Sequence, residues 1–289
     1  MDLEDVDPVV VMENNSDLKN GHIVGNYNRR QGMGLTKLIL KFAAPLPKIE
    51  TYNRFLFIGP HPDDIEIGAG ATAAKLVEMG KDVRFLVCID GRFGTTNAPE
   101  GLDGDKLVEV RRQEALLSAS KLGVNGVHFL DLKDGGFYEQ QDLIVGIAKA
   151  VGDFQPDVIF APDPCVTSEC HIDHLNVGNA AKQIAYFAPY KEIMHEYGAE
   201  PAPVKALAYY MTAKPTQYIK TSGYLKRQLD AIFLCHLSQF PEGCGDAQSI
   251  PLYLKLRSID FGIRSLKGCA EGFRVLGVTQ MHCLPEAGK

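Results

Sequence analysis

Four short apolar runs alternate with helix-like segments, and this alternation limits most strongly what the chain can fold into. The runs are FLFIG (55–59), VRFLVCI (83–89), VHFLDL (127–132) and VIFAP (158–162). Their almost continuous apolar character is typical of strands buried on both faces of a parallel sheet. Helical spacing follows each run, at residues 71–80, 105–123, 140–154 and 174–188. We therefore expect an α/β fold built from βαβ units, a Rossmann-like, mostly parallel sheet flanked by helices.

The remaining residues predict an N-terminal arm and a C-terminal extension of the same domain. Residues 1–50 have weak periodicity, with a short helix expected around 35–42. The runs ALAYYMT and TQYIKT and helices near 222–238 and 251–268 predict a C-terminal β/α elaboration. A length of 289 residues fits one such domain. We expect an arm over 1–50 and a single domain over 51–289.

Charge, hydropathy and cysteine content indicate the class of protein and disfavour several classes of partner. The formal net charge is −6 and no basic stripe is present, which disfavours nucleic acid. No apolar run approaches the roughly 18 residues that span a bilayer, so no membrane partner is expected. The acidic start MDLEDVD is unlike a signal peptide and indicates the cytoplasm. Seven scattered cysteines without a CxxC pair predict free thiols.

Unusual polar residues follow each of the four predicted strands. PHPDD follows the first, DGRFGTT the second, DGGF the third, and PDPCVTSECHIDH the fourth. Ligands of open α/β sheets bind beyond the carboxyl ends of the strands. The four segments are therefore expected to meet at one edge and form a site there.

The residue types at this edge favour a cation. Asp63 and Asp64 stand where a dinucleotide-binding loop would have glycines, and their carboxylates would repel a phosphate. An imidazole and a carboxylate suit Zn²⁺ or a similar divalent metal. His171 and His174 are three residues apart, so one helical turn brings them to the same side. One of these imidazoles, with His61 and Asp64, gives three ligands and leaves a position open for water, as in catalytic zinc sites.

Neighbouring residues predict the rest of a catalytic site. Asp63 is free to accept a proton from water if only Asp64 binds the metal. The second imidazole, on His171, is suited to stabilise an oxyanion or donate a proton, with Asp173 orienting it. Arg92 and Asp134, together with Asp90, lie at the same edge and are candidates to bind a polar substrate.

These motifs resemble the PIG-L/LmbE-like family of zinc-dependent N-deacetylases. The resemblance is carried by PHPDDIEIGAG and, about a hundred residues later, HIDH, and it extends from about residue 53 to the C-terminus. DGRFGTT, VRRQEA, FAPDP, HLSQF and AEGFRVL also match, and three of them are similar to the diacetylchitobiose deacetylase branch. The resemblance implies that His61, Asp64 and His174 bind zinc and that Asp63 is the general base.

The same resemblance implies further roles. His171 would stabilise the tetrahedral intermediate with support from Asp173, and the substrate-contacting arginine of the family falls on Arg111, or alternatively on Arg112. Some relatives have a tyrosine where Glu169 stands, so a tyrosine-assisted step is not expected. The implied substrate is N-acetylglucosamine or diacetylchitobiose, and the implied assembly is a homo-oligomer, a hexamer in the chitobiose-type branch.

Two other functions stay open from the residues alone. One is a zinc amidase that acts on a non-sugar N-acyl amine. The other is a non-catalytic sugar-binding protein that keeps a vestigial metal site, although an intact Asp63 and His171 argue against it. A Rossmann cofactor enzyme is disfavoured because the glycine fingerprint is absent.

Overall fold

The computed structural model describes residues 39–40, 42–282 and 284. A seven-stranded sheet runs through it in the order β3-β2-β1-β4-β5-β7-β6. Strands β1 to β5 are parallel, and β7 runs antiparallel to both β5 and β6. The strands are β1 (Arg54–Gly59), β2 (Asp82–Ile89), β3 (Gly126–Leu132), β4 (Val158–Pro162), β5 (Ala206–Tyr210), β6 (Gln217–Lys220) and β7 (Ala270–Gly277). The expected mostly parallel α/β sheet is confirmed.

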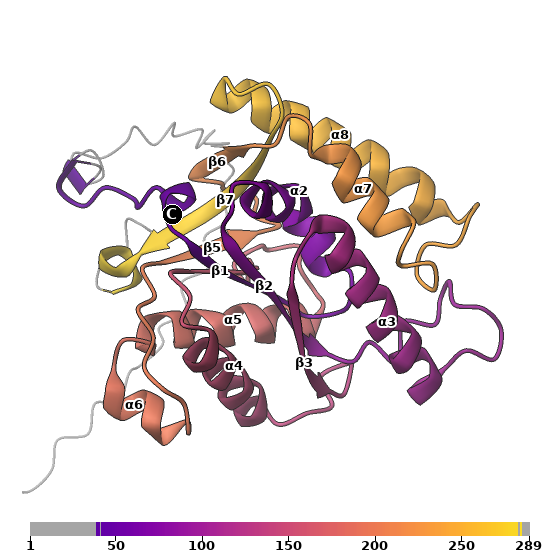
Figure 1. Cartoon of the computed structure of the whole chain (residues 1–289), viewed down its shortest axis with the longest axis horizontal. Coiled ribbons are helices and arrows are strands. Elements are labelled where there is room, and N and C mark those ends of the chain that lie inside the picture. Colours follow the sequence, from indigo (N-terminus) through magenta and orange to yellow (C-terminus); the bar gives the residue numbers. More distant parts are fainter. Residues whose placement is uncertain (1–38, 41, 283, 285–289) are drawn as a thin grey trace, which may run out of the picture.

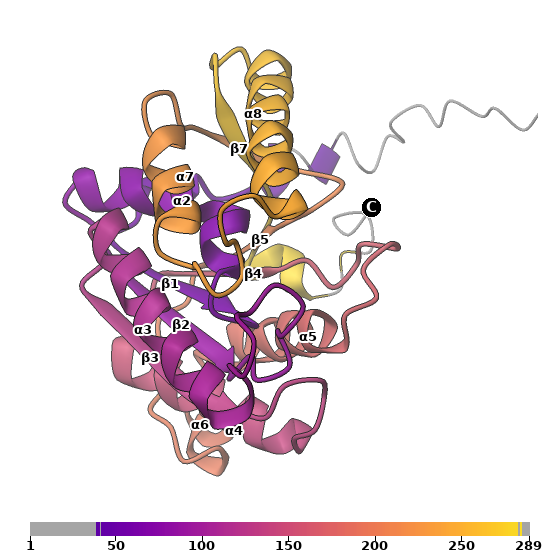
Figure 2. The same cartoon turned by 90° about the vertical axis from the view of Figure 1, so that its right-hand side faces the viewer.

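Helices cover both faces of the sheet (Figure 1). Helices α4 and α5 pack on one face, whereas α2 and α3 pack on the other. Helix α7 lies on α2 and α3, and α8 packs on β6 and β7 at the margin of the molecule (Figure 2). The helices are α2 (Asp64–Glu78), α3 (Gly104–Leu122), α4 (Gln140–Phe154), α5 (Ile172–Phe187), α6 (Lys191–Glu196), α7 (Leu225–Phe233) and α8 (Gly245–Ser265), with 3-10 turns η1 (Ile49–Thr51) and η2 (Val278–Met281).

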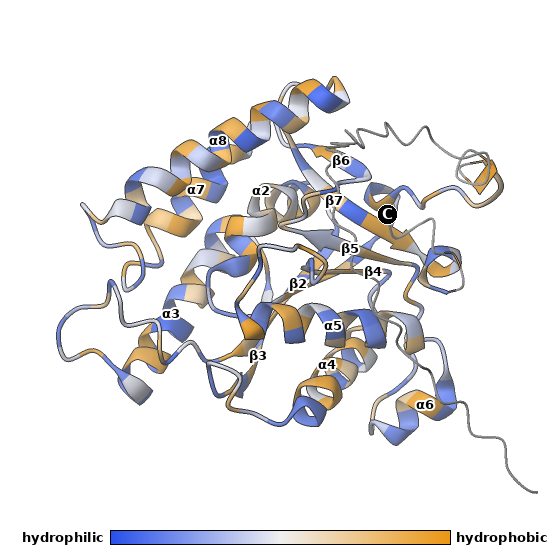
Figure 3. Cartoon of the chain, turned by 180° about the vertical axis from the view of Figure 1, so that it is seen from behind, coloured by the Kyte–Doolittle hydropathy of each residue, from blue (hydrophilic) through white to orange (hydrophobic). Residues whose placement is uncertain are grey.

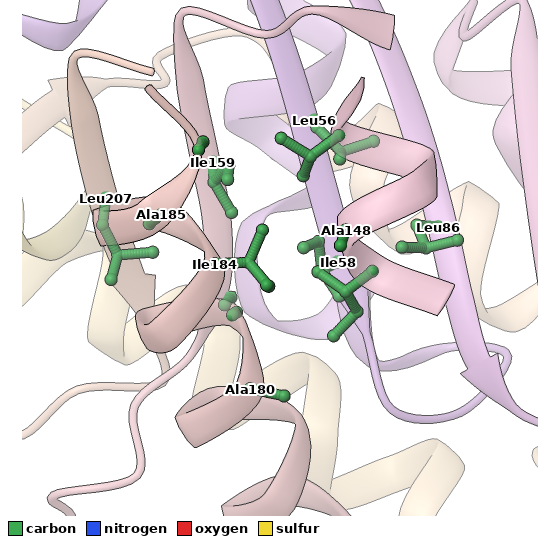
Figure 4. Close-up of a cluster of buried hydrophobic side chains, with 14 of the residues drawn as sticks. Leu56, Ile58, Leu86, Ala148, Ile159, Ala180, Ile184, Ala185 and Leu207 are labelled. Carbon is green, nitrogen blue, oxygen red and sulfur yellow. The ribbon is translucent and has the colours of Figure 1, made fainter. Parts of the chain in front are cut away.

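Alternate residues of β1 build the two halves of the core. Phe55 and Phe57 face the α2 side, where the ring of Phe57 stacks on that of Phe160 at 4.2 Å between centroids. Leu56 and Ile58 face the α4 and α5 side and pack among aliphatic side chains (Figure 4). All four side chains are essentially inaccessible, which explains why the run is apolar at every position.

Two features differ from the sequence-based expectation. Helix α2 begins at Asp64 rather than near residue 71, so the residues that follow the first proline pair are already helical. The run AEGFRVL forms β7, which inserts between β5 and β6.

The expected arm falls mainly on residues 1–38, which lie outside the described residues. In the part of the chain that is described, no helix is both long and apolar enough to cross a membrane, and six cysteines are free thiols.

Candidate active site

The turn between β1 and α2 carries His61, Asp63 and Asp64, three of the residues expected to form the site. The backbone N–H of His61 donates to Oδ2 of Asp64 at 2.9 Å, which closes the turn. Asp63 is the N-cap of α2 and has a φ of 134°, a backbone conformation that residues other than glycine rarely adopt. A residue in such a strained backbone conformation costs about 1–3 kcal/mol of stability, and such residues are common at functional sites. The backbone therefore turns Asp63 and Asp64 to different surroundings although they are adjacent in sequence.

Helix α2 is kinked shortly after its first turn. Ala69 has non-helical backbone angles, which interrupts the hydrogen bonds of the helix. The Gln228 side-chain amide donates to the carbonyl of Glu66 at 2.8 Å and to that of Ile67 at 3.3 Å. The Glu271 carboxylate accepts the N–H of Thr72 at 2.8 Å and that of Ala71 at 3.3 Å. Two side chains thus replace the missing backbone partners and fix the first turn, which carries Asp64.

Gly68 permits the close approach of this kinked helix to the sheet. A Cβ atom there would lie 2.2 Å from the ring of Tyr210, a buried residue of β5. The Tyr210 hydroxyl donates to the carbonyl of Ile58 at 2.8 Å, so the ring has little freedom to move away. Glycine at position 68 is therefore required for α2 to pack against β5.

His61, Asp64 and His174 form a compact three-ligand cluster. Oδ2 of Asp64 lies 3.2 Å from Nδ1 of His61 and 3.3 Å from Nε2 of His174. One ligand atom from each residue lies within 4.8 Å of the others. His174 belongs to α5, which begins after the fourth parallel strand, so the cluster joins two loops at the carboxyl edge of the sheet. Two imidazole nitrogens and one carboxylate oxygen fit a catalytic divalent-metal site such as that of zinc.

Carboxylates engage the other nitrogen of each imidazole. Nε2 of His61 lies 3.2 Å from Asp134 and 3.2 Å from Asp173. Nδ1 of His174 lies 3.1 Å from Oε2 of Glu169, whose Oε1 accepts the N–H of His171 at 2.8 Å. Metal-binding histidines commonly donate their second N–H to a carboxylate, which fixes the tautomer and ring orientation. The surroundings therefore support the metal-binding interpretation independently of the ligands themselves.

Asp173 lies closer to His61 than to His171. Its oxygens accept the N–H groups of Gly135 and Gly136 at 2.9 Å, and Oδ2 is 3.7 Å from Nδ1 of His171. The Asp173 backbone contacts His171 as well, since its N–H donates to that Nδ1 at 3.3 Å. His171 is the N-cap of α5, and its ring stacks on His174 at 5.0 Å between centroids.

Asp63 forms an ion pair with the buried Arg111. Burial raises the pKa of Asp63 to about 6, although the charge of Arg111 opposes this shift. Nη2 of Arg111 lies 3.2 Å from Oδ2 of Asp63 and donates to the carbonyl of Pro62 at 3.0 Å, while Nη1 donates to that of Gly91 at 2.9 Å. A Cβ at Gly91 or Gly94 would lie within 2.6 Å of Nη1, so both glycines of DGRFG make room for this guanidinium.

A pocket of about 340 Å³ opens beside these groups. Among the residues expected to bind substrate, Arg111 and Asp134 line it, whereas Arg92 does not. Arg92 instead pairs with Asp90 at 2.7 Å and with Asp105 at 3.2 Å. The pocket is lined by His61, Asp63, Phe93, Gly94, Arg111, Asp134, Gly135, His171 and Gln239.

In the HLSQF segment (236–240), Gln239 lines the pocket whereas His236 is buried in the core. Gln239 lines the pocket and donates to the carbonyl of Gly94 at 2.9 Å. His236 is fully buried, with Nε2 3.4 Å from Oε1 of Glu66, a carboxylate that also accepts the Ser118 hydroxyl. Sequence reasoning missed Gln239 and the orienting role of Glu169. The available signal was the position of Glu169, two residues before His171 and five before His174.

Comparison with known proteins agrees with this site. A model of the PIG-L family, described as GlcNAc-PI de-N-acetylase, matches residues 56–185. A diacetylchitobiose deacetylase of Thermococcus kodakarensis is 30% identical over 91% of this chain and 96% of its own length. A 1D-myo-inositol 2-acetamido-2-deoxy-alpha-D-glucopyranoside deacetylase of Kineococcus radiotolerans is 36% identical over 42% of this chain and 35% of its own.

A solved structure has the same architecture. The N,N'-diacetylchitobiose deacetylase from Pyrococcus horikoshii, complexed with an inhibitor, superposes with a TM-score of 0.75. It is 29% identical, and the match covers 87% of this chain and 96% of that one. The likeness therefore extends well beyond the strand-end motifs.

Proposed function

The chain belongs to the PIG-L family of de-N-acetylases, and we propose that it is a zinc-dependent hydrolase that removes the acetyl group from an N-acetylglucosamine-type sugar. The observation that carries the proposal is the placement of Asp63. This acid, with a pKa near 6, lines the same pocket as His61, one of the three residues of the cluster. The hydrolysis of a sugar N-acetyl group is also the activity for which relatives of similar length are named.

The proposed metal ligands are Nδ1 of His61, Oδ2 of Asp64 and Nε2 of His174. We propose zinc because two imidazoles and a carboxylate are typical of catalytic zinc sites. When bound, the ion would polarise the amide carbonyl and make water more acidic. Glu169, Asp134 and Asp173 would keep both imidazoles in the tautomer that presents the correct nitrogen.

Asp63 is the proposed general base. A pKa of about 6 leaves its carboxylate ionised at neutral pH yet basic enough to accept a proton from water. The water oxygen forms a bond to the amide carbon as its proton passes to Asp63. The carbon–nitrogen bond then breaks, the proton passes from Asp63 to the leaving nitrogen, and acetate and a free amine result.

His171 is the proposed partner of the developing oxyanion. Its Nδ1 accepts the N–H of Asp173, which places Nε2 on the opposite side of the ring. The ring lines the pocket beside His61. A positioned donor at such a point contributes about 2.7–4 kcal/mol of transition-state stabilisation in known acyl-transfer sites.

Arg111 and Asp134 are the pocket-lining residues that we propose to help bind the sugar. Arg111 already holds two carbonyls and Asp63, so its part is to shape the pocket as well as to present charge. Arg92 remains a weaker proposal, since its guanidinium is engaged by Asp90 and Asp105. N-acetylglucosamine and diacetylchitobiose are the proposed substrates, with a non-sugar N-acyl amine as the alternative.

Acetate release from a panel of amides tests the proposal. N-acetylglucosamine, diacetylchitobiose and an aromatic N-acyl amine are each incubated with the protein, with and without a chelator. We expect acetate from a sugar only, and loss of activity on chelation that zinc restores. Release from the aromatic amide alone would favour the amidase alternative. Stoichiometric bound metal without any hydrolysis would favour a non-catalytic sugar-binding protein.

Assembly and location are further proposals. The resemblance implies a homo-oligomer, hexameric in the chitobiose-type branch, and the free thiols of the described cysteines support the proposal of a cytoplasmic location. Size measurement in solution and fractionation of cells test these two points.

A further inference from the structure

Two exposed phenylalanines lie together beside the candidate pocket. Three phenylalanines are exposed in the part of the chain that the structure describes, and two of them are Phe93, at 51%, and Phe137, at 67%. Their ring centroids are 6.0 Å apart and their planes meet at 83°, an edge-to-face contact that aromatic pairs favour. Phe93 lines the pocket, whereas Phe137 is not part of the lining. The pair, here called the aromatic rim, therefore continues the pocket wall outward.

The backbone of the aromatic rim is tied to the candidate site. The N–H of Phe93 donates to Oδ2 of Asp134 at 3.0 Å, and Oδ1 of that carboxylate is 3.2 Å from Nε2 of His61. Two residues before Phe137, the N–H of Gly135 donates to Asp173 at 2.9 Å. The segments after β2 and β3 thus meet beside the start of α5 (Figure 3). The two rings are therefore held in a fixed place relative to the proposed metal ligands.

Gly135 lies next to both rings. A Cβ atom there would be 3.3 Å from the ring of Phe137 and 3.5 Å from that of Phe93. Its φ of 79° also belongs to the region that favours glycine. The chain thus turns sharply and brings the two phenylalanines together without covering them. Single exposed apolar side chains are ordinary, but a group of them at the edge of a pocket indicates a binding surface.

Polar groups surround the aromatic rim. Nζ of Lys133 lies 5.5 Å from the centroid of the Phe137 ring, and the side chains of Thr95 and Thr96 are exposed shortly after Phe93. This combination suits an occupant that is apolar on its faces and polar at its edge. A pyranose ring has that character, since its C–H groups pack on the negative face of an aromatic ring while its hydroxyls form hydrogen bonds. A wholly apolar group would leave the ammonium and hydroxyl groups unused.

We propose that the aromatic rim is a subsite for a second sugar ring, linked to the ring that carries the acetyl group. The inference rests on the proposed function and deepens it. The scissile amide has to reach His61 and Asp63, so the acylated ring occupies the pocket beside Phe93. A ring linked to it then extends out of the pocket and over Phe137. Phe137 therefore selects for a disaccharide, whereas Phe93 serves both sugars.

Steady-state kinetics on a monosaccharide and a disaccharide test the proposal. Phe137→Ala is expected to raise KM for diacetylchitobiose about twofold to tenfold, the range of aromatic contacts, and to leave kcat and the KM for N-acetylglucosamine unchanged. Phe137→Tyr keeps the ring and is expected to keep the wild-type KM. Phe42→Ala is the matched control, because Phe42 is 80% exposed and does not line the pocket. Phe93→Ala is expected to raise KM for both sugars.

Three kinetic outcomes overturn the proposal. The first is an unchanged KM for diacetylchitobiose in Phe137→Ala. The second is an equal rise of KM for the monosaccharide and the disaccharide. The third is an effect confined to an aryl glycoside of N-acetylglucosamine, which would make an apolar group the occupant.

Sugar binding without turnover separates this inference from the proposed function. The probe is the fully deacetylated disaccharide, which has no amide to cleave, and saturation-transfer NMR detects contacts of each of its rings with the protein. Both rings are expected to receive saturation from the wild type, and one of them is expected to lose it in Phe137→Ala. Absence of acetate release from both acetylated sugars would refute the proposed function, and the NMR result would then decide on the subsite alone. Equal saturation in the wild type and Phe137→Ala would refute the subsite.

Discussion

The carboxylate of Glu169 holds the imidazole of His174, with 3.1 Å between Oε2 and Nδ1. The other oxygen of Glu169 accepts the N–H of His171, so one side chain ties together the two histidines at the start of α5. This contact leaves Nε2 of His174 directed at Asp64. Glu169 is therefore a positioning residue for the proposed metal site.

The first prediction concerns this positioning. Glu169→Gln removes the negative charge and one of two acceptors, and we expect metal affinity to fall about 10- to 100-fold, as for other outer residues of metal sites. Competitive titration with a chromophoric chelator measures the affinity without any turnover. Glu192→Gln, an exposed carboxylate on α6, is the control. An unchanged affinity in Glu169→Gln would contradict the role.

The second prediction separates the base from the ligands. Asp63→Asn is expected to keep bound metal and to lose about 10²- to 10⁴-fold in kcat, the usual contribution of a general base. His174→Ala is expected to lose the metal itself, since Nε2 of that residue is one of three proposed ligand atoms. Elemental analysis after gel filtration, together with acetate release, distinguishes the two. Wild-type turnover in Asp63→Asn would refute the assignment.

A third prediction compares the two neighbouring arginines of α3. Arg111 is buried and donates to the carbonyls of Pro62 and Gly91, so Arg111→Lys leaves at least one acceptor without a partner. Hydrogen bonds to charged groups contribute about 1.5–3 kcal/mol, and we expect a loss of unfolding free energy in that range together with reduced activity. Arg112 pairs with Asp131 at the surface, and Arg112→Lys is expected to change stability by less than about 1 kcal/mol. Urea unfolding monitors both variants, and equal effects would contradict this distinction.

A fourth prediction follows from the approach of α2 to β5. Gly68→Ala places a methyl group against the ring of Tyr210, and overpacking of this kind costs about 1–3 kcal/mol. Gly80→Ala has open space but a φ of 76°, so its cost is backbone strain alone. We expect Gly68→Ala to lower activity as well, because the shifted turn carries Asp64, whereas Gly80→Ala lowers only thermal stability. Thermal unfolding and acetate release check the pair, and full activity in Gly68→Ala would speak against this packing argument.

The fifth prediction concerns pH and Glu271. Burial raises the pKa of Glu271 to about 7, against an ordinary value of 4.5. Between these values the folded protein keeps a proton that the unfolded chain has released, so the free energy of unfolding falls as pH rises. The slope reaches at most about 1.4 kcal/mol per pH unit, and the effect is constant below 4.5 and above 7. We expect Glu271→Gln to gain stability relative to the wild type across this window, as measured by urea unfolding at several pH values. A constant difference between the two proteins would exclude the shift.

The sequence pattern was sufficient to predict the parallel sheet and the gathering of His61 and Asp64 with one of His171 and His174, and the family resemblance selected His174. Continuous apolar runs have few alternatives to buried parallel strands, and strand ends of one sheet must share an edge. The structure brings His61, Asp64 and His174 together as expected. Local pattern therefore determined both the architecture and the location of the candidate site.

The start of α2 was not predictable in the same way. From the sequence this helix was expected at 71–80, after Gly68 and Gly70, and glycine ordinarily weakens a helix. Their reason lies in Tyr210 and Gln228, which are far away in sequence and meet α2 only after folding. The role of Glu271 at the kink has the same origin, since β7 reaches α2 only through the antiparallel end of the sheet.

Gln239 contributes to the pocket wall from the segment between α7 and α8, long after His174 in the chain. The groups proposed to cleave the amide all come from residues 61 to 174. Part of the pocket wall is thus encoded in a stretch of sequence separate from the proposed catalytic groups. Exchange of the 234–244 segment between homologues would consequently alter which acylated amines are accepted, while the bond-breaking apparatus stays the same.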